Sequence, residues 1–172
     1  MKKPWKRSEA AASAEDSDAA APDPQALERT AVGLLARREH SRAELLQKLT
    51  ARGFDITAVE SLLDRLAAQR LQSDARFAEI YVRMRSGRGY GPQRIRAELR
   101  ERGVAAELID HEVATLAGAD VGRIDDIWRR KFAGQLPQDF RERARQMRFL
   151  QQRGFSPADI HALFGRLGGA DD

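Results

Sequence analysis

One short pattern occurs three times along this chain of 172 residues, and it constrains the fold more than any other feature. Each copy reads leucine, two variable residues, arginine, glycine and one apolar residue. The glycines are Gly53, Gly103 and Gly154, which lie 50 and 51 residues apart. A period of this length is typical of tandem repeats, in which each unit buries its apolar face against its neighbours. The copies are Leu49–Phe54, Leu99–Val104 and Leu150–Phe155.

The glycine in each copy predicts the end of a helix. Helices often stop at a residue in the left-handed conformation, which glycine adopts without the steric penalty of a Cβ atom. In such a cap the apolar residue after the glycine packs back against the leucine, and the arginine favours the negative end of the helix dipole. Apolar residues then continue at spacings of four and three, as on one face of a following helix. They are Val59, Leu63 and Leu66; Ile109, Val113 and Leu116; and Ile160, Phe164 and Leu167.

Capping residues predict where several helices begin. Ser41-Arg-Ala-Glu44 and Thr57-Ala-Val-Glu60 both have the pattern of a capping box. Gly91 and Ser156 are each followed by proline, which favours the first position of a helix. The chain is therefore expected to be divided into short helices with sharp turns.

The third copy departs from the other two in its middle. Gln146 stands where Leu45 and Ile95 stand in the first two copies. Its middle helix is expected to begin near Asp139, and its packing to differ from that of the other units.

A further apolar stripe precedes each capped pair of helices, so each unit is predicted to contain three. We predict an all-α fold of three tandem three-helix repeats that form an elongated, curved body. The beginning of the chain is rich in Ala, Ser, Asp and Pro and lacks the apolar surface needed for a core, which predicts disorder. The predicted segments are a disordered Ala/Asp/Pro-rich tail (1–25), repeat one (26–74), a basic repeat two (75–121) and repeat three (122–172).

The composition excludes several kinds of site. The chain has no cysteine, so it can form no disulfide, thiolate zinc site or cysteine nucleophile. It has no apolar run long enough to cross a bilayer, and we expect a cytoplasmic protein that contacts no membrane. The net charge of +4 suggests an acidic partner, either nucleic acid or a protein surface.

No group of residues predicts catalysis. The three histidines lie at different distances from the repeat glycines and share no spacing typical of metal ligands. Gly87-Arg-Gly89-Tyr-Gly91 resembles a phosphate-binding loop, but no strand precedes it and no Lys-Ser/Thr pair ends it. We read it as a turn between helices and expect no enzymatic activity, no cofactor and no metal.

Positive charge is concentrated in repeat two. From Arg76 to Arg102 there are eight arginines and three glutamates, a balance of +5. A solvated helix face with acidic partners explains some of them, such as the pair of Glu98 and Arg102. No acid follows Arg83, Arg85 or Arg88 at such a spacing. These arginines favour a surface that binds phosphate or carboxylate, which the planar guanidinium contacts with two hydrogen bonds.

The order of these motifs resembles the bacterial RecX family of recombination regulators, over about residues 27–168. No single segment is diagnostic, but the order is specific, with Asp74-Ala-Arg-Phe-Ala78 between the first and second Arg-Gly motifs. The other segments that carry the resemblance are 41–53, Gly91–Val104 and Arg148–Phe155.

The resemblance implies a protein that binds the RecA recombinase and the filament that RecA forms on single-stranded DNA. Members of the family lie in the helical groove of that filament and contact neighbouring subunits. They suppress strand exchange, ATP hydrolysis and the RecA-stimulated cleavage of the LexA repressor. The candidate contact residues are Arg76, Tyr81, Arg83, Arg85, Arg88, Tyr90, Arg94 and Arg96, followed by Trp128, Arg129, Arg130 and Lys131.

Two other interpretations compete with this one. The chain could bind DNA directly through helix-turn-helix-like units, with its arginines on phosphates and an affinity that falls steeply with salt. Few Asn or Gln residues lie at the start of a clear recognition helix, which weakens the case for base-specific reading. A helical-repeat scaffold for some other protein is the second alternative. In each case we expect a monomer.

Overall fold

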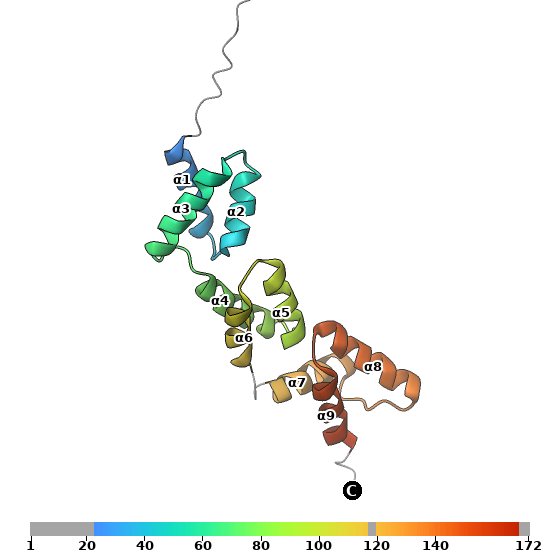
Figure 1. Ribbon diagram of the computed structural model, residues 1–172. Coiled ribbons are helices and arrows are strands. Elements are labelled where there is room, and N and C mark those ends of the chain that lie inside the picture. The colour runs from blue at the N-terminus through green and yellow to red at the C-terminus, as the bar shows by residue number, and fades with distance from the viewer. Residues whose placement is uncertain (1–22, 117–119, 169–172) are drawn as a thin grey trace, which may run out of the picture.

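The computed structural model describes residues 23–116 and 120–168 (Figure 1). All regular secondary structure in these two ranges is helical, and the helices form three successive groups of three. The predicted all-α fold of three tandem three-helix repeats is confirmed, while most of the predicted tail lies outside the described residues. Repeat one contains α1 (Pro24–Leu35), α2 (Arg42–Thr50) and α3 (Ile56–Ala68); repeat two contains α4 (Asp74–Gly87), α5 (Pro92–Glu101) and α6 (Ala106–Ala114); repeat three contains α7 (Asp120–Phe132), α8 (Phe140–Arg153) and α9 (Pro157–Gly168).

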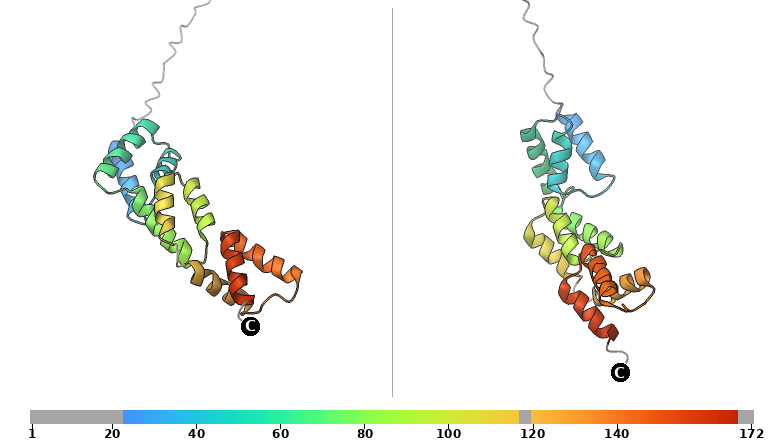
Figure 2. Two further views of the ribbon diagram at one scale, coloured as in Figure 1. Left: turned by 60° about the horizontal axis from the view of Figure 1, so that its bottom comes forward. Right: turned by 90° about the vertical axis from the view of Figure 1, so that its right-hand side faces the viewer.

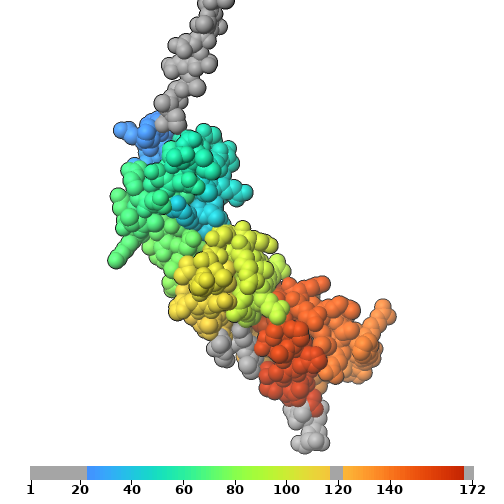
Figure 3. All heavy atoms as spheres, in the orientation of Figure 1, coloured from blue at the N-terminus to red at the C-terminus, as the bar shows by residue number. Residues whose placement is uncertain are grey.

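Each repeat has its own hydrophobic core. The leucine of the repeated motif is fully buried in all three, as Leu49, Leu99 and Leu150. The apolar residue after each glycine packs into the same core as that leucine. The body is elongated and bent, and the three repeats follow one another along it (Figures 2 and 3).

The repeat glycines end α2, α5 and α8 as predicted. Gly53, Gly103 and Gly154 have φ angles of 88°, 71° and 91°, in the left-handed region. The N–H of the residue after each glycine donates to the carbonyl of the motif leucine, at 3.4, 3.2 and 3.2 Å. This hydrogen bond closes the helix end and places the apolar residue against the core.

Most of the predicted helix starts are confirmed. Ser41, Asp139 and Ser156 each accept a hydrogen bond from a backbone N–H in the first turn of their helix. The prediction for α3 is wrong by two residues, because Asp55 rather than Thr57 is the N-cap. The carboxylate of Asp55 accepts from the N–H of Ala58 at 2.9 Å. A carboxylate caps a helix at least as well as a threonine hydroxyl, and the earlier start lengthens the helix by about half a turn.

The polar residue in the middle of repeat three is accommodated by a buried hydrogen-bond network. Gln146 is 2% exposed, and its side-chain oxygen accepts from Nε1 of Trp128 at 2.7 Å. Its amide nitrogen donates to the carbonyl of Gln135 at 3.2 Å. The buried indole N–H and the buried amide of Gln146 are thus both satisfied by hydrogen bonds.

The middle helices join the repeats end to end. At the first junction, the hydroxyl of Ser41 at the start of α2 donates to the carbonyl of Arg102 at the end of α5, at 2.7 Å. At the second, the N–H of Gly91 at the start of α5 donates to the carbonyl of Arg153 at the end of α8, at 2.8 Å. The N–H of Gln93 adds a bond to the carbonyl of Gly154 at 3.0 Å. Each junction therefore pairs the amino end of one helix with the carboxyl end of another.

Two of the repeat glycines also allow these junctions to close. A Cβ atom on Gly103 would lie 2.5 Å from the Cβ of Ala43, and one on Gly154 would lie 2.5 Å from the backbone nitrogen of Arg94. The equivalent position on Gly53 has nothing within 4 Å, since none of the described residues covers that end of α2. Glycine is thus required at position 53 by backbone conformation alone, and at the other two positions by close approach as well.

Candidate functional site

One of the predicted contact residues, Arg76, stabilises the first junction. The guanidinium of Arg76 forms two hydrogen bonds with the carboxylate of Glu39, the shorter at 2.6 Å. Glu39 lies just before α2 and Arg76 lies in the first turn of α4, so this ion pair links repeats one and two. Hydrogen bonding to Glu39 raises the pKa of Arg76. Arg76 thus has a structural role in holding repeats one and two together.

A second group surrounds the carboxylate of Glu98 on α5. Arg85 donates to it twice, with Nε at 2.6 Å, and Arg94 and the hydroxyl of Tyr81 donate at 3.0 and 2.9 Å. Burial raises the pKa of Glu98, but the hydrogen bonds from Arg85, Arg94 and Tyr81 outweigh it and hold that pKa below its usual value. Arg85 and Glu98 are only 14% and 15% exposed, so this cluster is a structural feature of repeat two.

The ring of Tyr90 lies between arginines of two repeats. The guanidinium of Arg85 lies 3.8 Å from the ring centroid, that of Arg94 lies at 4.4 Å, and that of Arg153 lies at 5.4 Å. Such cation–π contacts favour a fixed arrangement of the planar groups. Tyr90 thus connects the basic part of repeat two with the end of α8.

Two more arginines of repeat two have acidic partners. Arg83 pairs with Glu79, one turn earlier on α4, and Arg96 pairs with Asp110 of α6 at 3.2 Å. The sequence argument considered only acids that follow an arginine, and it therefore missed Glu79. Much of the basic character expected of repeat two is offset by these ion pairs.

The second group of predicted residues divides between core and surface. Trp128 is 1% exposed and lies in the core of repeat three, where it cannot touch a partner. Arg129 pairs with Asp125 at 2.9 Å. Arg130 and Lys131 are exposed, and no carboxylate among the described side chains lies within 4 Å of their charged groups. Arg88 of repeat two shares this property.

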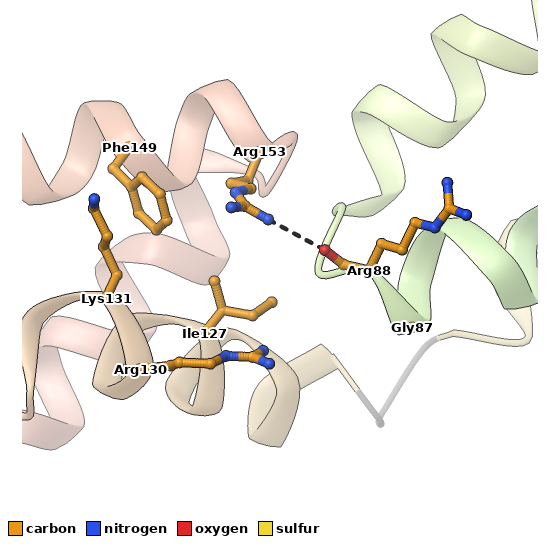
Figure 4. Close-up of a pocket in the computed structure, with 7 residues that line it drawn as sticks. All are labelled: Gly87, Arg88, Ile127, Arg130, Lys131, Phe149 and Arg153. Atoms are coloured by element: carbon orange, nitrogen blue, oxygen red, sulfur yellow. Dashed lines mark hydrogen bonds between the residues drawn. The ribbon is translucent and has the colours of Figure 1, made fainter.

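A cavity of about 300 Å³ at the second junction is lined in part by these three residues (Figure 4). Arg153 reaches across it and donates to the carbonyl of Arg88 at 3.2 Å, while the guanidinium of Arg88 itself points away. Lys131 lies beside the ring of Phe149, with its Nζ 5.8 Å from the centroid. The other lining residues are Gly87, Ile127 and Arg130.

The surface continues from this cavity along α8. A neighbouring hollow of about 530 Å³ shares Lys131 and Phe149 with the first and adds Arg145 and Arg148. No described carboxylate pairs with these two arginines either. We define the basic track as five residues: Arg130, Lys131, Arg145, Arg148 and Arg153.

The sequence contained a signal for the basic track that our prediction did not use. Residues 127–153 hold eight cations and two acids, a balance of +6, which exceeds that of residues 76–102. Arg141, Arg145 and Arg148 are spaced by four and three, which places them on one face of a helix. Arg153 was read only as a helix-ending residue, and the path of its side chain across the junction depends on how the repeats dock.

Other kinds of site find no support in the described part of the chain. The residues that the structure describes contain no cluster of three or more His, Cys, Asp or Glu side chains able to hold a metal ion. Within the same ranges no helix combines the length and apolar character required to cross a membrane.

Comparison with known proteins agrees with this architecture. The models of the first, second and third three-helix domains of RecX match residues 29–66, 73–111 and 120–164. A crystal structure of RecX from Lactobacillus salivarius superposes with a TM-score of 0.73 at 19% identity, covering 85% of this chain and 97% of that one, which shows a shared fold.

Close relatives extend the comparison to the sequence. A regulatory protein RecX of Pseudomonas putida is 52% identical over 144 residues, which are 84% of this chain and 90% of the relative. One from Pseudomonas syringae pv. tomato is 45% identical over 148 residues, covering 86% of this chain and 96% of the relative. With all three domain models matched in order and identities near one half, the chain belongs to the RecX family.

Proposed function

We propose that this chain binds the RecA recombinase and its filament on single-stranded DNA, and that it inhibits ATP hydrolysis, strand exchange and RecA-stimulated cleavage of LexA. Membership of a family of regulatory proteins supports this function, as does the shape of the molecule. The proposal places the activity in the cytoplasm, assigns it to the monomer and requires no catalysis by the chain itself.

The observation that carries the proposal is the end-to-end joining of three repeats. Helices of 9, 10 and 14 residues placed in series span roughly 50 Å along the body, at about 1.5 Å per residue. Backbone and side-chain hydrogen bonds at both junctions fix the repeats relative to one another. A rigid body of this length can contact more than one subunit of a filament at once, which raises its affinity through a high effective concentration.

The test is a titration of RecA's ATP hydrolysis on single-stranded DNA with this protein. The variant for comparison changes Arg88, Arg130 and Lys131 together to Gln, because these exposed cations have no acidic partner among the described residues. Arg85 is left intact, since its loss would disturb the Glu98 cluster. A matched control changes three exposed cations of repeat one, Arg37, Arg52 and Arg65, to Gln.

We expect hydrolysis to stop well below one protein per RecA subunit, to require more of the triple variant, and to be unaffected by the control substitutions. Hydrolysis that continues with the protein in excess over both RecA and DNA would contradict the proposal. In the direct DNA-binding alternative, the chain would bind duplex and single strands alike without RecA and leave hydrolysis by preformed filaments unchanged.

A further inference from the structure

No carboxylate among the described residues forms an ion pair with a cation of the basic track. Its five cations come from α7 and α8 and surround two connected hollows. The two acids nearest the start of α8 are already engaged at that helix end. Asp139 accepts from the N–H of Glu142 at 2.7 Å, and Glu142 accepts from the N–H of Gln138 at 3.0 Å. The exposed cations of the track are therefore free to bind an external anion.

The geometry of the track fits a chain of anionic groups better than a single ion. Arg145, Arg148 and Gln152 are spaced by three and four residues along α8. From Arg145 to Arg153 the helix rises roughly 12 Å, at about 1.5 Å per residue. Guanidinium groups distributed over this length suit successive phosphates, which each accept two parallel hydrogen bonds from arginine.

An exposed aromatic ring lies at the far end of the same helix. Phe140, the first residue of α8, is 88% exposed, the highest value among the exposed large apolar residues of the described ranges. It is followed at once by Arg141, which lines a third hollow together with Arg145 and Arg148 and with the helix-capping acids Asp139 and Glu142. Single-strand binding proteins combine cations that contact phosphates with exposed rings on which unpaired bases stack, and α8 carries both kinds of side chain.

We propose that the basic track and Phe140 bind the backbone and one base of a single-stranded nucleic acid. This inference rests on the proposed function and deepens it, because it gives the regulator a direct contact with the strand inside the filament. An acidic protein surface would fit the cations but would leave Phe140 without an apolar partner. A duplex would offer phosphates but no accessible base face.

The first experiment measures binding of fluorescent oligothymidylate to the full chain without RecA, over a range of salt concentrations. The test variant carries Arg130→Gln with Lys131→Gln, and the matched control carries Arg37→Gln with Arg52→Gln. The affinity falls with salt, and each lost phosphate contact on a single strand makes the slope of log affinity against log salt shallower by about 0.7. We therefore expect a slope that is shallower by about 1.4 in the test variant and unchanged in the control.

The second experiment examines the stacking contact. Phe140→Ala is expected to weaken oligothymidylate binding by roughly tenfold, whereas Phe140→Trp is expected to preserve it. The new tryptophan, compared with the unmodified chain, should lose fluorescence when oligothymidylate binds and keep it when inorganic tripolyphosphate is added. A matched duplex should bind more weakly than the single strand.

Four results would overturn the inference. The unmodified chain could fail to bind oligothymidylate at low salt, or the test variant could show the salt slope of the control. Tripolyphosphate could compete as well as an oligonucleotide of equal charge. Finally, the Arg130 and Lys131 substitutions could abolish inhibition of RecA while they leave oligothymidylate binding intact. The last result would assign the track to an acidic protein surface. The proposed function would survive any of the four, because inhibition of hydrolysis is measured separately.

Discussion

The hydroxyl of Ser41 donates to the carbonyl of Arg102, 61 residues away, while its oxygen caps α2 by accepting from the N–H of Glu44. One small side chain therefore closes a helix and joins two repeats. Ser41→Ala removes both bonds and leaves the Arg102 carbonyl without its partner. The expected loss is about 2 kcal/mol in the free energy of unfolding, measured by urea denaturation.

The control for this substitution is Ser156→Ala, which removes the N-cap of α9 without touching a neighbouring repeat. Its expected cost is about 1 kcal/mol. Equal losses for the two variants would show that the bond from Ser41 to repeat two contributes nothing to stability.

The three repeat glycines are expected to differ in their response to alanine. Gly53→Ala incurs only the strain of the left-handed conformation, about 1 kcal/mol. Gly103→Ala and Gly154→Ala add collisions with Ala43 and Arg94 across the junctions and should cost about 1–3 kcal/mol more. Denaturation gives these energies, and small-angle X-ray scattering should show a changed overall shape for the second and third variants only. An unchanged shape in all three would contradict the close-packed junctions.

Trp128 and Gln146 form a pair whose contribution a double-mutant cycle can measure. Trp128→Phe leaves the buried Gln146 oxygen without a donor, and Gln146→Leu leaves the indole N–H without an acceptor. Each single change should cost about 1–3 kcal/mol, because a buried polar group loses its partner. The double variant should cost less than the sum, and strict additivity would show that the two side chains are not coupled.

The cluster around Glu98 makes stability depend on pH. Its pKa is lower in the folded protein than the usual 4.5, so the folded state binds this proton less readily than the unfolded state does. The stabilisation is therefore complete above pH 4.5 and is lost as the pH falls through the lowered pKa. Glu98→Gln should cost about 1–2 kcal/mol at pH 7, since residual exposure screens the pair, and this difference should shrink in acid.

Glu79→Gln is the matched control, because Glu79 pairs with Arg83 at side-chain exposures of 53% and 73%. An exposed pair of this kind contributes little, so we expect a change below about 0.5 kcal/mol. A difference between wild type and Glu98→Gln that stays constant down to strongly acidic pH would contradict the assigned role of Glu98.

The repeated units were predictable from the sequence because their determinants are local. A glycine that ends a helix, the leucine four residues before it and a capping serine act within one or two turns of chain. The start of α3 was misplaced where two capping residues compete, and the aspartate lies nearer to the preceding glycine. Such ambiguity is small because either choice gives the same helix face.

The candidate site was less predictable, because its charges depend on contacts between repeats. Arg76 is bound by Glu39, and Arg153 reaches the carbonyl of Arg88, at separations of 37 and 65 residues. Nothing in the local pattern states which arginine will be paired and which will remain free. The sequence argument placed the unpaired cations in repeat two, whereas the structure places most of them at the second junction and along α8.

The end-to-end stacking also gives the protein a direction. The peptide dipoles of α2, α5 and α8 point the same way along the body, with exposed carbonyl groups at the Gly53 end and amide groups at the Asp139 end. A filament built from identical subunits joined head to tail is itself directional. If the chain binds a RecA filament as proposed, it should therefore bind in one orientation, because reversing it would exchange the basic third repeat for the more nearly neutral first one at every contact.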